Sequence, residues 1–198
     1  MPGAQGLRRD AAANRERRIE VAIDVFNVEG SDACVEQIAQ RAGVGIGTLY
    51  RRFPTKEALI AHLVDELLIE MIEAGDRARD LETGHGLEQY MRAVGDMFAR
   101  RKGFLSPLWG GGEVTRIEQL RAGQHALLID PQYAGVIGTD IIATDLTLLL
   151  WSLRGIARSS GDFASQACQR HLDMVFAGLH SRPGTLTNPP PTARQLNS

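Results

Sequence analysis

The chain has 198 residues, 43% hydrophobic and 23% charged, which is ordinary for a soluble globular protein with one compact unit or two small domains. The formal net charge of −2 excludes binding of nucleic acid through an overall basic field, so such a partner must be met by a local patch. Two cysteines, Cys34 and Cys168, fit free thiols in a reducing cytoplasm, and no apolar run reaches the ~20 residues that span a bilayer.

The first predicted elements are three short helices followed by a long one. A helical spacing of apolar residues ends at Gly30, and a second short helix ends at Gly43. A third helix is closed by Pro54, because the residue before a proline avoids the helical region. Thr55 is expected to cap a long fourth helix that ends near Arg79.

The rest of the chain also has the apolar spacing of helices. Four are predicted, over residues 87–101, 114–128, 141–159 and about 163–179, with a short helical piece that begins at Pro131. The helix over 141–159 is apolar on nearly every side, so we expect it to be buried or to lie against a partner. With no strand-like alternation and no internal repeat, the chain is predicted to be all-α with about nine helices.

The stretch RAGVGIGTLYRRF, residues 41–53, allows two interpretations. A phosphate-binding loop needs the spacing G-x-G-x-x-G directly after a buried strand. Here the spacing is G-x-G-x-G, and the preceding CVEQIAQRA has a helical period. The sequence therefore favours a helix-turn-helix in which Gly43 takes the left-handed conformation of the turn.

The longer run VFNVEGSDACVEQIAQRAGVGIGTLYRRFPTKEALI resembles the DNA-binding region of the TetR family of bacterial transcriptional regulators. The remainder of the chain resembles that family only in architecture. The resemblance implies a three-helix helix-turn-helix domain joined by the long fourth helix to a helical domain for ligand binding and dimerisation. The predicted boundaries are 1–13 for a disordered arm, 14–62 for the DNA-binding domain, 63–180 for the regulatory and dimerisation domain and 181–198 for a disordered tail.

The resemblance also implies which residues meet DNA, since the family's third helix enters the major groove. Thr48 and Tyr50 stand where the family contacts backbone phosphates, and Lys56 places a positive charge at the start of the fourth helix. Arg52 stands near phosphate as well, whereas Arg51 is equally well a solvated surface residue. The full predicted set is Gly45, Ile46, Gly47, Thr48, Tyr50, Arg51, Arg52 and Lys56.

Two positions depart from the family pattern. Cys34 stands where the family usually has a serine or threonine cap, and a thiol is a poor cap; we interpret it as a passive small residue rather than a redox sensor. Gly45 stands where a serine is usual. Together with Gly47 it would let the backbone approach the groove closely. Ile46 between them can pack on a thymine methyl but cannot form a hydrogen bond, so we hypothesise readout through shape and methyl contacts.

The C-terminal domain is expected to hold a pocket for a small-molecule effector between its helices. Few ionisable residues lie among the apolar ones, so an apolar or aromatic effector is expected. The candidate lining residues are Met97, Phe104, Leu108, Trp109, Tyr133 and Trp151. The last two helices are expected to pair with those of a twofold mate, which would place two recognition helices about 34–36 Å apart.

These expectations describe a cytoplasmic, homodimeric repressor that binds a palindromic operator and is released by a small molecule. We expect no catalytic residues, no metal site and no cofactor, since the five histidines lack a metal-ligand spacing such as H-x-x-x-H. Two alternatives stay open: a DNA-binding regulator without a small-molecule effector, and a helical enzyme or carrier with an incidental helix-turn-helix.

Overall fold

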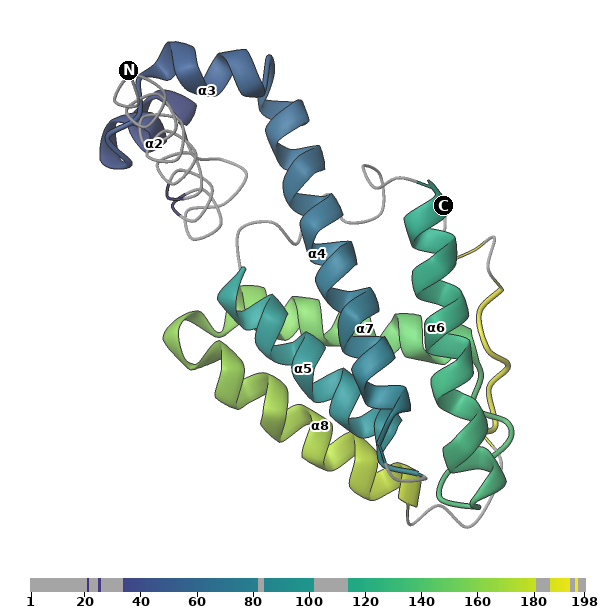
Figure 1. Ribbon diagram of the computed structural model, residues 1–198. Helices are drawn as coiled ribbons and strands as arrows, with labels where there is room; N and C mark the ends of the chain where they lie inside the picture. The colour runs from purple at the N-terminus through teal and green to yellow at the C-terminus, as the bar shows by residue number, and fades with distance from the viewer. Residues whose placement is uncertain are drawn as a thin grey trace, which may run out of the picture.

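The computed structural model describes residues 21, 25, 34–81, 84–101, 114–180, 186–192 and 195. All regular structure in these ranges is helical, which confirms the predicted all-α fold (Figure 1). The helices are α2 (Val35–Arg41), α3 (Ile46–Arg52), α4 (Lys56–Arg79), α5 (Gly86–Arg100), α6 (Val114–Tyr133), α7 (Ala143–Ser159), the short 3₁₀ helix η2 (Gly161–Phe163) and α8 (Ala164–His180). None of these helices is long and apolar enough to cross a membrane. The predicted helix that ends at Gly30 lies outside the described residues, apart from Val21 and Val25.

In the described residues, the part of the chain after α5 holds one helix where the sequence predicts a helix and a separate short piece. The short piece predicted to begin at Pro131 is the last turn of α6, which runs without interruption to Tyr133. Proline lacks a backbone N–H, so at this place it removes one helical hydrogen bond. The turn still closes, because Ala134 N donates to Asp130 O at 2.9 Å and Val136 N donates to Pro131 O at 2.8 Å.

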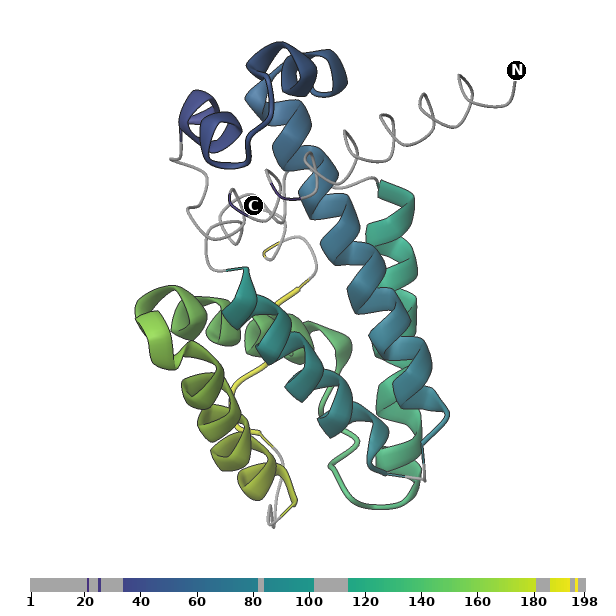
Figure 2. The same cartoon turned by 60° about the vertical axis from the view of Figure 1, so that its left-hand side comes forward.

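Helix α4 connects two separate hydrophobic cores (Figures 1 and 2). Leu59 and Leu63 pack with α2 and α3 in a small N-terminal core, whereas Val64 and Leu67 belong to the large core of the helices that follow. Ile60 packs against both cores. The change from one core to the other therefore takes place within one helix, close to the predicted boundary at 62, and no linker separates the two.

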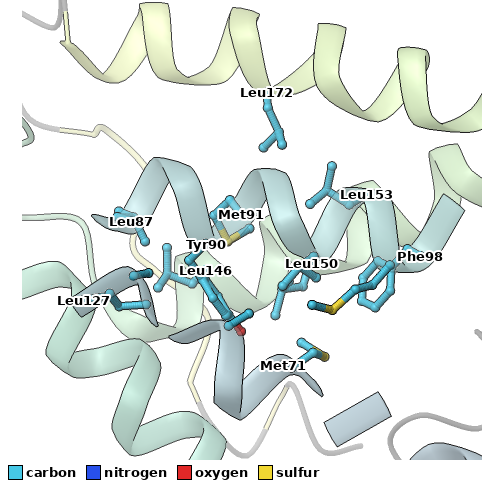
Figure 3. Packing of buried hydrophobic residues seen from close by; sticks show 14 of the residues in the cluster. Met71, Leu87, Tyr90, Met91, Phe98, Leu127, Leu146, Leu150, Leu153 and Leu172 are labelled. Carbon is cyan, nitrogen blue, oxygen red and sulfur yellow. The ribbon is translucent and has the colours of Figure 1, made fainter. Parts of the chain in front are cut away.

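The large core is enclosed by α4 to α8. Helices α5 and α8 lie side by side, α7 packs against both, and α6 lies along α4 (Figures 1 and 2). Leucine, methionine and aromatic side chains from these helices fill the interior (Figure 3). Ion pairs fasten the outer helices: Arg116 of α6 pairs with Asp65 of α4, and Arg92 of α5 pairs with Asp173 of α8 at 2.9 Å.

Part of the predicted disordered tail is described, over residues 186–192. Leu186 N donates to the Asp140 carboxylate at 2.8 Å, so this segment contacts the loop between α6 and α7. The domain boundaries proposed from the sequence stay predictions.

Replacing Gly86 or Gly123 with alanine is expected to change the free energy of unfolding in opposite directions. At Gly86, the first residue of α5, a methyl group would lie 2.5 Å from Ala78 O, whereas at Gly123 in α6 it would meet no atom within 4 Å. We expect Gly86→Ala to lower the free energy of unfolding by about 1–3 kcal/mol through overpacking. Gly123→Ala should raise it by up to about 1 kcal/mol, because alanine is the better helix former. Urea unfolding of both variants checks this, and equal effects would contradict the tight approach of α5 to α4.

Candidate nucleic-acid interface

The turn between α2 and α3 has the geometry that its sequence predicts. Gly43 adopts a left-handed conformation with φ of 64°. Its N–H donates to Gln40 O at 3.1 Å, and Val44 N donates to Ala39 O at 2.9 Å, a pair of bonds that closes the end of α2 as a Schellman motif. This confirms Gly43 as the turn residue of a helix-turn-helix. Val44 then enters the small N-terminal core, which fixes the direction of α3.

The starts of α3 and α4 are capped differently. Thr55 Oγ1 accepts from Ala58 N at 3.1 Å, so the predicted cap of α4 is confirmed. Gly45 occupies the N-cap of α3 and offers no side chain to it. A methyl group at Gly45 would come no closer than 3.8 Å to another heavy atom, and one at Gly47 would meet nothing within 4 Å. The two glycines therefore leave the first turn of α3 unobstructed on its outer side.

The remaining predicted DNA-binding residues lie on the outside of α3 or at the start of α4. Leu49 is buried, whereas Ile46 is 38% exposed and Tyr50 39% exposed. Arg51 and Arg52 are exposed at the end of α3, and the Arg52 guanidinium lies 5.6 Å from the centre of the Phe53 ring. The set is completed by two half-buried residues, Thr48 and Lys56. Their contacts with DNA stay predictions.

Tyr50, on this surface, forms a hydrogen bond with the carboxylate of Glu36, which was not among the predicted site residues. The Tyr50 hydroxyl donates to Glu36 Oε1 at 3.0 Å, and the Cys34 thiol donates to Glu36 Oε2 at 2.9 Å. Cys34 makes no side-chain cap bond to α2, which confirms that the thiol is a poor cap. The thiol hydrogen bond, the backbone N–H of Glu36 and the Tyr50 hydroxyl hold the pKa of Glu36 below its ordinary value. Glu36 therefore carries a full negative charge at neutral pH.

Nothing in the sequence points to the pairing of Glu36 with Tyr50. The two residues are 14 positions apart, on different helices, and become neighbours only through the angle at which the Gly43 turn sets α3 against α2. An acidic residue in the first turn of α2 is expected from the helix dipole alone. The position of Glu36 in the helix therefore gives no indication of its hydrogen bond with Tyr50.

A second candidate site is a cavity of about 210 Å³ between α4 and α6, floored by Tyr90 of α5. The described residues that line it are Met71, Ile72, Gly75, Asp76, Arg79, Tyr90, Gln119, Leu120, Ala122, Gly123 and Gln124. None of the six residues predicted to line an effector pocket is among them. Gln124 lies on the same face of α6 as Leu120, Leu127 and Leu128. A polar residue on a buried apolar face needs a hydrogen-bond partner, and this is the signal in the sequence that could have indicated the site.

The three predicted pocket residues that the structure describes differ in their exposure to solvent. Met97 is buried in the large core, whereas Tyr133 is 93% exposed at the end of α6 and Trp151 is 37% exposed on α7. Neither of the two exposed side chains is among the described residues that line the cavity between α4 and α6. Phe104, Leu108 and Trp109 lie outside the described residues. Trp151 instead belongs to an outer face of α7 that continues onto α8.

Comparison with known proteins agrees with this geometry. A family model described as bacterial regulatory proteins, tetR family, matches residues 19–63, which include α2, α3 and the first turns of α4. A solved TetR transcriptional regulator from Streptomyces coelicolor is 32% identical, with 84% of this chain and 98% of that chain covered and a TM-score of 0.60. A solved TetR regulatory protein from Mycobacterium vanbaalenii is 30% identical, with 88% and 99% covered and a TM-score of 0.59.

Curated relatives match over part of their length and part of this chain. An HTH-type transcriptional regulator of Staphylococcus aureus (strain bovine RF122) is 35% identical over 75 residues. The match spans 37% of this chain and 40% of that relative.

Glu36 should compete with DNA phosphate for the Tyr50 hydroxyl and repel the phosphate by its charge. We expect Glu36→Gln to tighten DNA binding by about two- to fivefold, the range of a surface charge interaction. Glu73→Gln, on the exposed side of α4 far from α3, should leave the affinity unchanged. In a Tyr50→Phe background the gain from Glu36→Gln should shrink, which a double-mutant cycle by fluorescence anisotropy measures. Weaker binding by Glu36→Gln would show instead that the carboxylate orients Tyr50 for DNA.

Proposed function

Because this chain belongs to the TetR family of DNA-binding transcriptional regulators, we propose that it is a cytoplasmic repressor. It binds a palindromic operator as a homodimer and leaves it when a small molecule enters the domain after α3. The observation that carries this proposal is the continuity of α4, whose first turn adjoins the recognition helix and whose last turns line the cavity. Its 24 residues, at about 1.5 Å each, span about 36 Å.

The proposed contacts with DNA divide into two kinds. Thr48, Tyr50, Arg52 and Lys56 carry hydroxyl groups or positive charges suited to phosphate oxygens, which fix the position of the protein on the duplex. Ile46, on the outer side of the first turn of α3 between Gly45 and Gly47, has only an apolar surface to offer to base edges. Arg51 completes the exposed positive end of α3.

The proposed dimer interface is the outer face of α7 and α8. The Ser152 hydroxyl and His171 Nε2 lie 2.9 Å apart and mark where the two helices meet at this face. Leu148 stands four residues before Ser152, and Met174 stands three residues after His171. Leu148 is 41% exposed and Met174 is 59% exposed. Because the short η2 connection makes α7 and α8 antiparallel, these side chains lie on neighbouring turns and form an apolar surface suited to the same surface of a second copy.

Release by an effector is supported by the position of the cavity. A ligand between α4 and α6 bears on the last turns of α4, while Leu59 and Leu63 hold the first turns against the helix-turn-helix. A shift of α4 in the large core therefore changes the position of α3. In a symmetric dimer such a shift alters the distance between the two recognition helices, and the half-sites of an operator are at a fixed spacing.

The two kinds of DNA contact predict different losses on substitution. Lys56→Ala should weaken binding to operator and to random DNA alike and should reduce the salt slope by about one unit. Ile46→Ala should weaken operator binding selectively, at one A·T pair, by about 1–3 kcal/mol. Titrations with the DNA upstream of the chain's own gene, and with random duplexes, measure both.

The matched control is Arg77→Ala, an exposed positive charge at the opposite end of α4, which should change neither affinity. A uniform loss for Ile46→Ala on both kinds of DNA would contradict base readout by this residue. Failure of the unmodified chain to shift any upstream DNA would contradict operator binding there.

The dimer interface predicts the effect of a buried charge. Met174→Glu should convert the dimer to a monomer, because it places a carboxylate in an apolar interface without a partner. Ile129→Glu, on the exposed side of α6, is the control, since Ile129 is 54% exposed and lies outside this face. Sedimentation equilibrium distinguishes the two, and a dimer that survives Met174→Glu would place the interface elsewhere.

A further inference from the structure

The cavity between α4 and α6 is small, and its lining is part apolar and part polar. Its volume of about 210 Å³ exceeds the roughly 150 Å³ of an engineered apolar cavity that binds benzene, and it is below the roughly 300 Å³ of the smallest usual drug-sized pockets. Met71, Ile72 and Leu120 supply its apolar surface, and two glycines, Gly75 and Gly123, leave room beside the helix backbones. It therefore fits a molecule with a single ring and a small substituent.

A buried polar pair lies at the floor of the cavity. Gln124 Nε2 donates to the Tyr90 hydroxyl oxygen at 2.9 Å, and Tyr90 is 1% and Gln124 4% exposed. In Figure 3 the Tyr90 side chain extends from α5 with its hydroxyl oxygen directed toward α4. Burial raises the pKa of Tyr90 well above its ordinary value, so the phenol keeps its proton.

This pair has hydrogen-bonding capacity that the described part of the chain does not use. The Tyr90 hydroxyl accepts from Gln124, and no described residue accepts the Tyr90 proton. Gln124 Oε1 likewise has no donor among the described residues, yet it is not one of the fully enclosed atoms without a partner. Because Gln124 is among the residues that line the cavity, we infer that this oxygen is accessible from the cavity. The floor thus offers one donor, the Tyr90 hydroxyl, beside one acceptor, Gln124 Oε1. Both residues are at least 96% buried.

The charges around the cavity cancel. Its charged lining residues are Asp76 and Arg79, on neighbouring turns of α4 and partly exposed, and they form an ion pair with each other. Among the described lining residues, a charged ligand would find no opposite charge that is not already paired to compensate the loss of its hydration. A neutral ligand avoids that cost.

We propose that this cavity binds a neutral, single-ring molecule with one group that both accepts and donates a hydrogen bond, such as a hydroxyl or a primary amide. That group accepts from the Tyr90 hydroxyl and donates to Gln124 Oε1, while the ring lies among Met71, Ile72 and Leu120. The assignment deepens the proposed function, on which it rests, because it gives the chemical class of the effector and its position.

Three probes of nearly equal shape test the assignment on the full chain. 4-Methylphenol carries the hydroxyl, toluene lacks it, and 4-methylbenzoate carries a negative charge. By isothermal titration, 4-methylphenol should bind about tenfold more tightly than toluene, since two net hydrogen bonds of ordinary strength are worth about that factor. 4-Methylbenzoate should bind most weakly of the three. Equal affinities for the first two, tightest binding of the benzoate, or no binding of any probe would each overturn the proposal.

Two variants locate the binding site. Gln124→Leu removes the acceptor and puts an apolar side chain of similar size in its place. It should therefore reduce the preference for 4-methylphenol over toluene to about threefold or less, while toluene still binds. Retained toluene binding shows that the cavity remains folded. Gly123→Leu should abolish binding of both probes by filling the cavity, and a methyl there meets no neighbour within 4 Å. Undiminished binding to the Gly123→Leu variant would place the site elsewhere and overturn the assignment.

The measurements separate this inference from the proposed function. Ligand affinity is measured without DNA, and the effect of 4-methylphenol on operator affinity is measured afterwards. Binding of the probe with the expected preference but without DNA release would leave the cavity assignment intact and contradict effector control. DNA release that persists in Gly123→Leu would contradict the cavity as the source of that control.

Discussion

The structure depends on α4 being shared by two cores. Leu59 and Leu63 fix its first turns to the helix-turn-helix, and Val64 and Leu67, on the next positions of the same helix, fix the rest among α5 to α8. A continuous helix bends little over this length, so neither core can turn against α4 without losing its packing. The position of α3 is therefore set by how α4 lies against α6, where Asp65 pairs with Arg116 and where the cavity opens.

The sequence predicts those features that residue type decides locally. Gly43 makes the turn because few other residues adopt its backbone conformation, and Thr55 caps α4 because its hydroxyl reaches the next N–H groups. The all-α fold follows from apolar spacing in the same way. The end of α6 was mistaken because a proline in a last turn removes only one hydrogen bond, and the sequence does not show how near that turn is to the helix end.

The sites depend on contacts between helices, and there the sequence was a weaker guide. Aromatic residues are equally suited to a pocket, a core or an interface, so Tyr133 and Trp151 could not be sorted before their exposure was known. The cavity arises instead where Gly75 of α4 and Gly123 of α6 leave their helices without side chains, next to the buried pair of Tyr90 and Gln124. Space of this kind is a property of two facing helices, so neither helix reveals it alone.

The size of the cavity sets a limit on the regulation that is proposed. A ligand shifts an equilibrium only by the difference between its affinities for the two states, and a single-ring molecule of few atoms supplies a small difference. DNA binding that such a ligand can reverse must itself be moderate. On the proposed function, we expect the helix-turn-helix to meet this condition, because its recognition helix combines glycines and an isoleucine with a tyrosine whose hydroxyl already donates to Glu36. On the proposed function, we expect the Glu36 carboxylate beside the recognition helix to keep the complex with DNA weak enough for release.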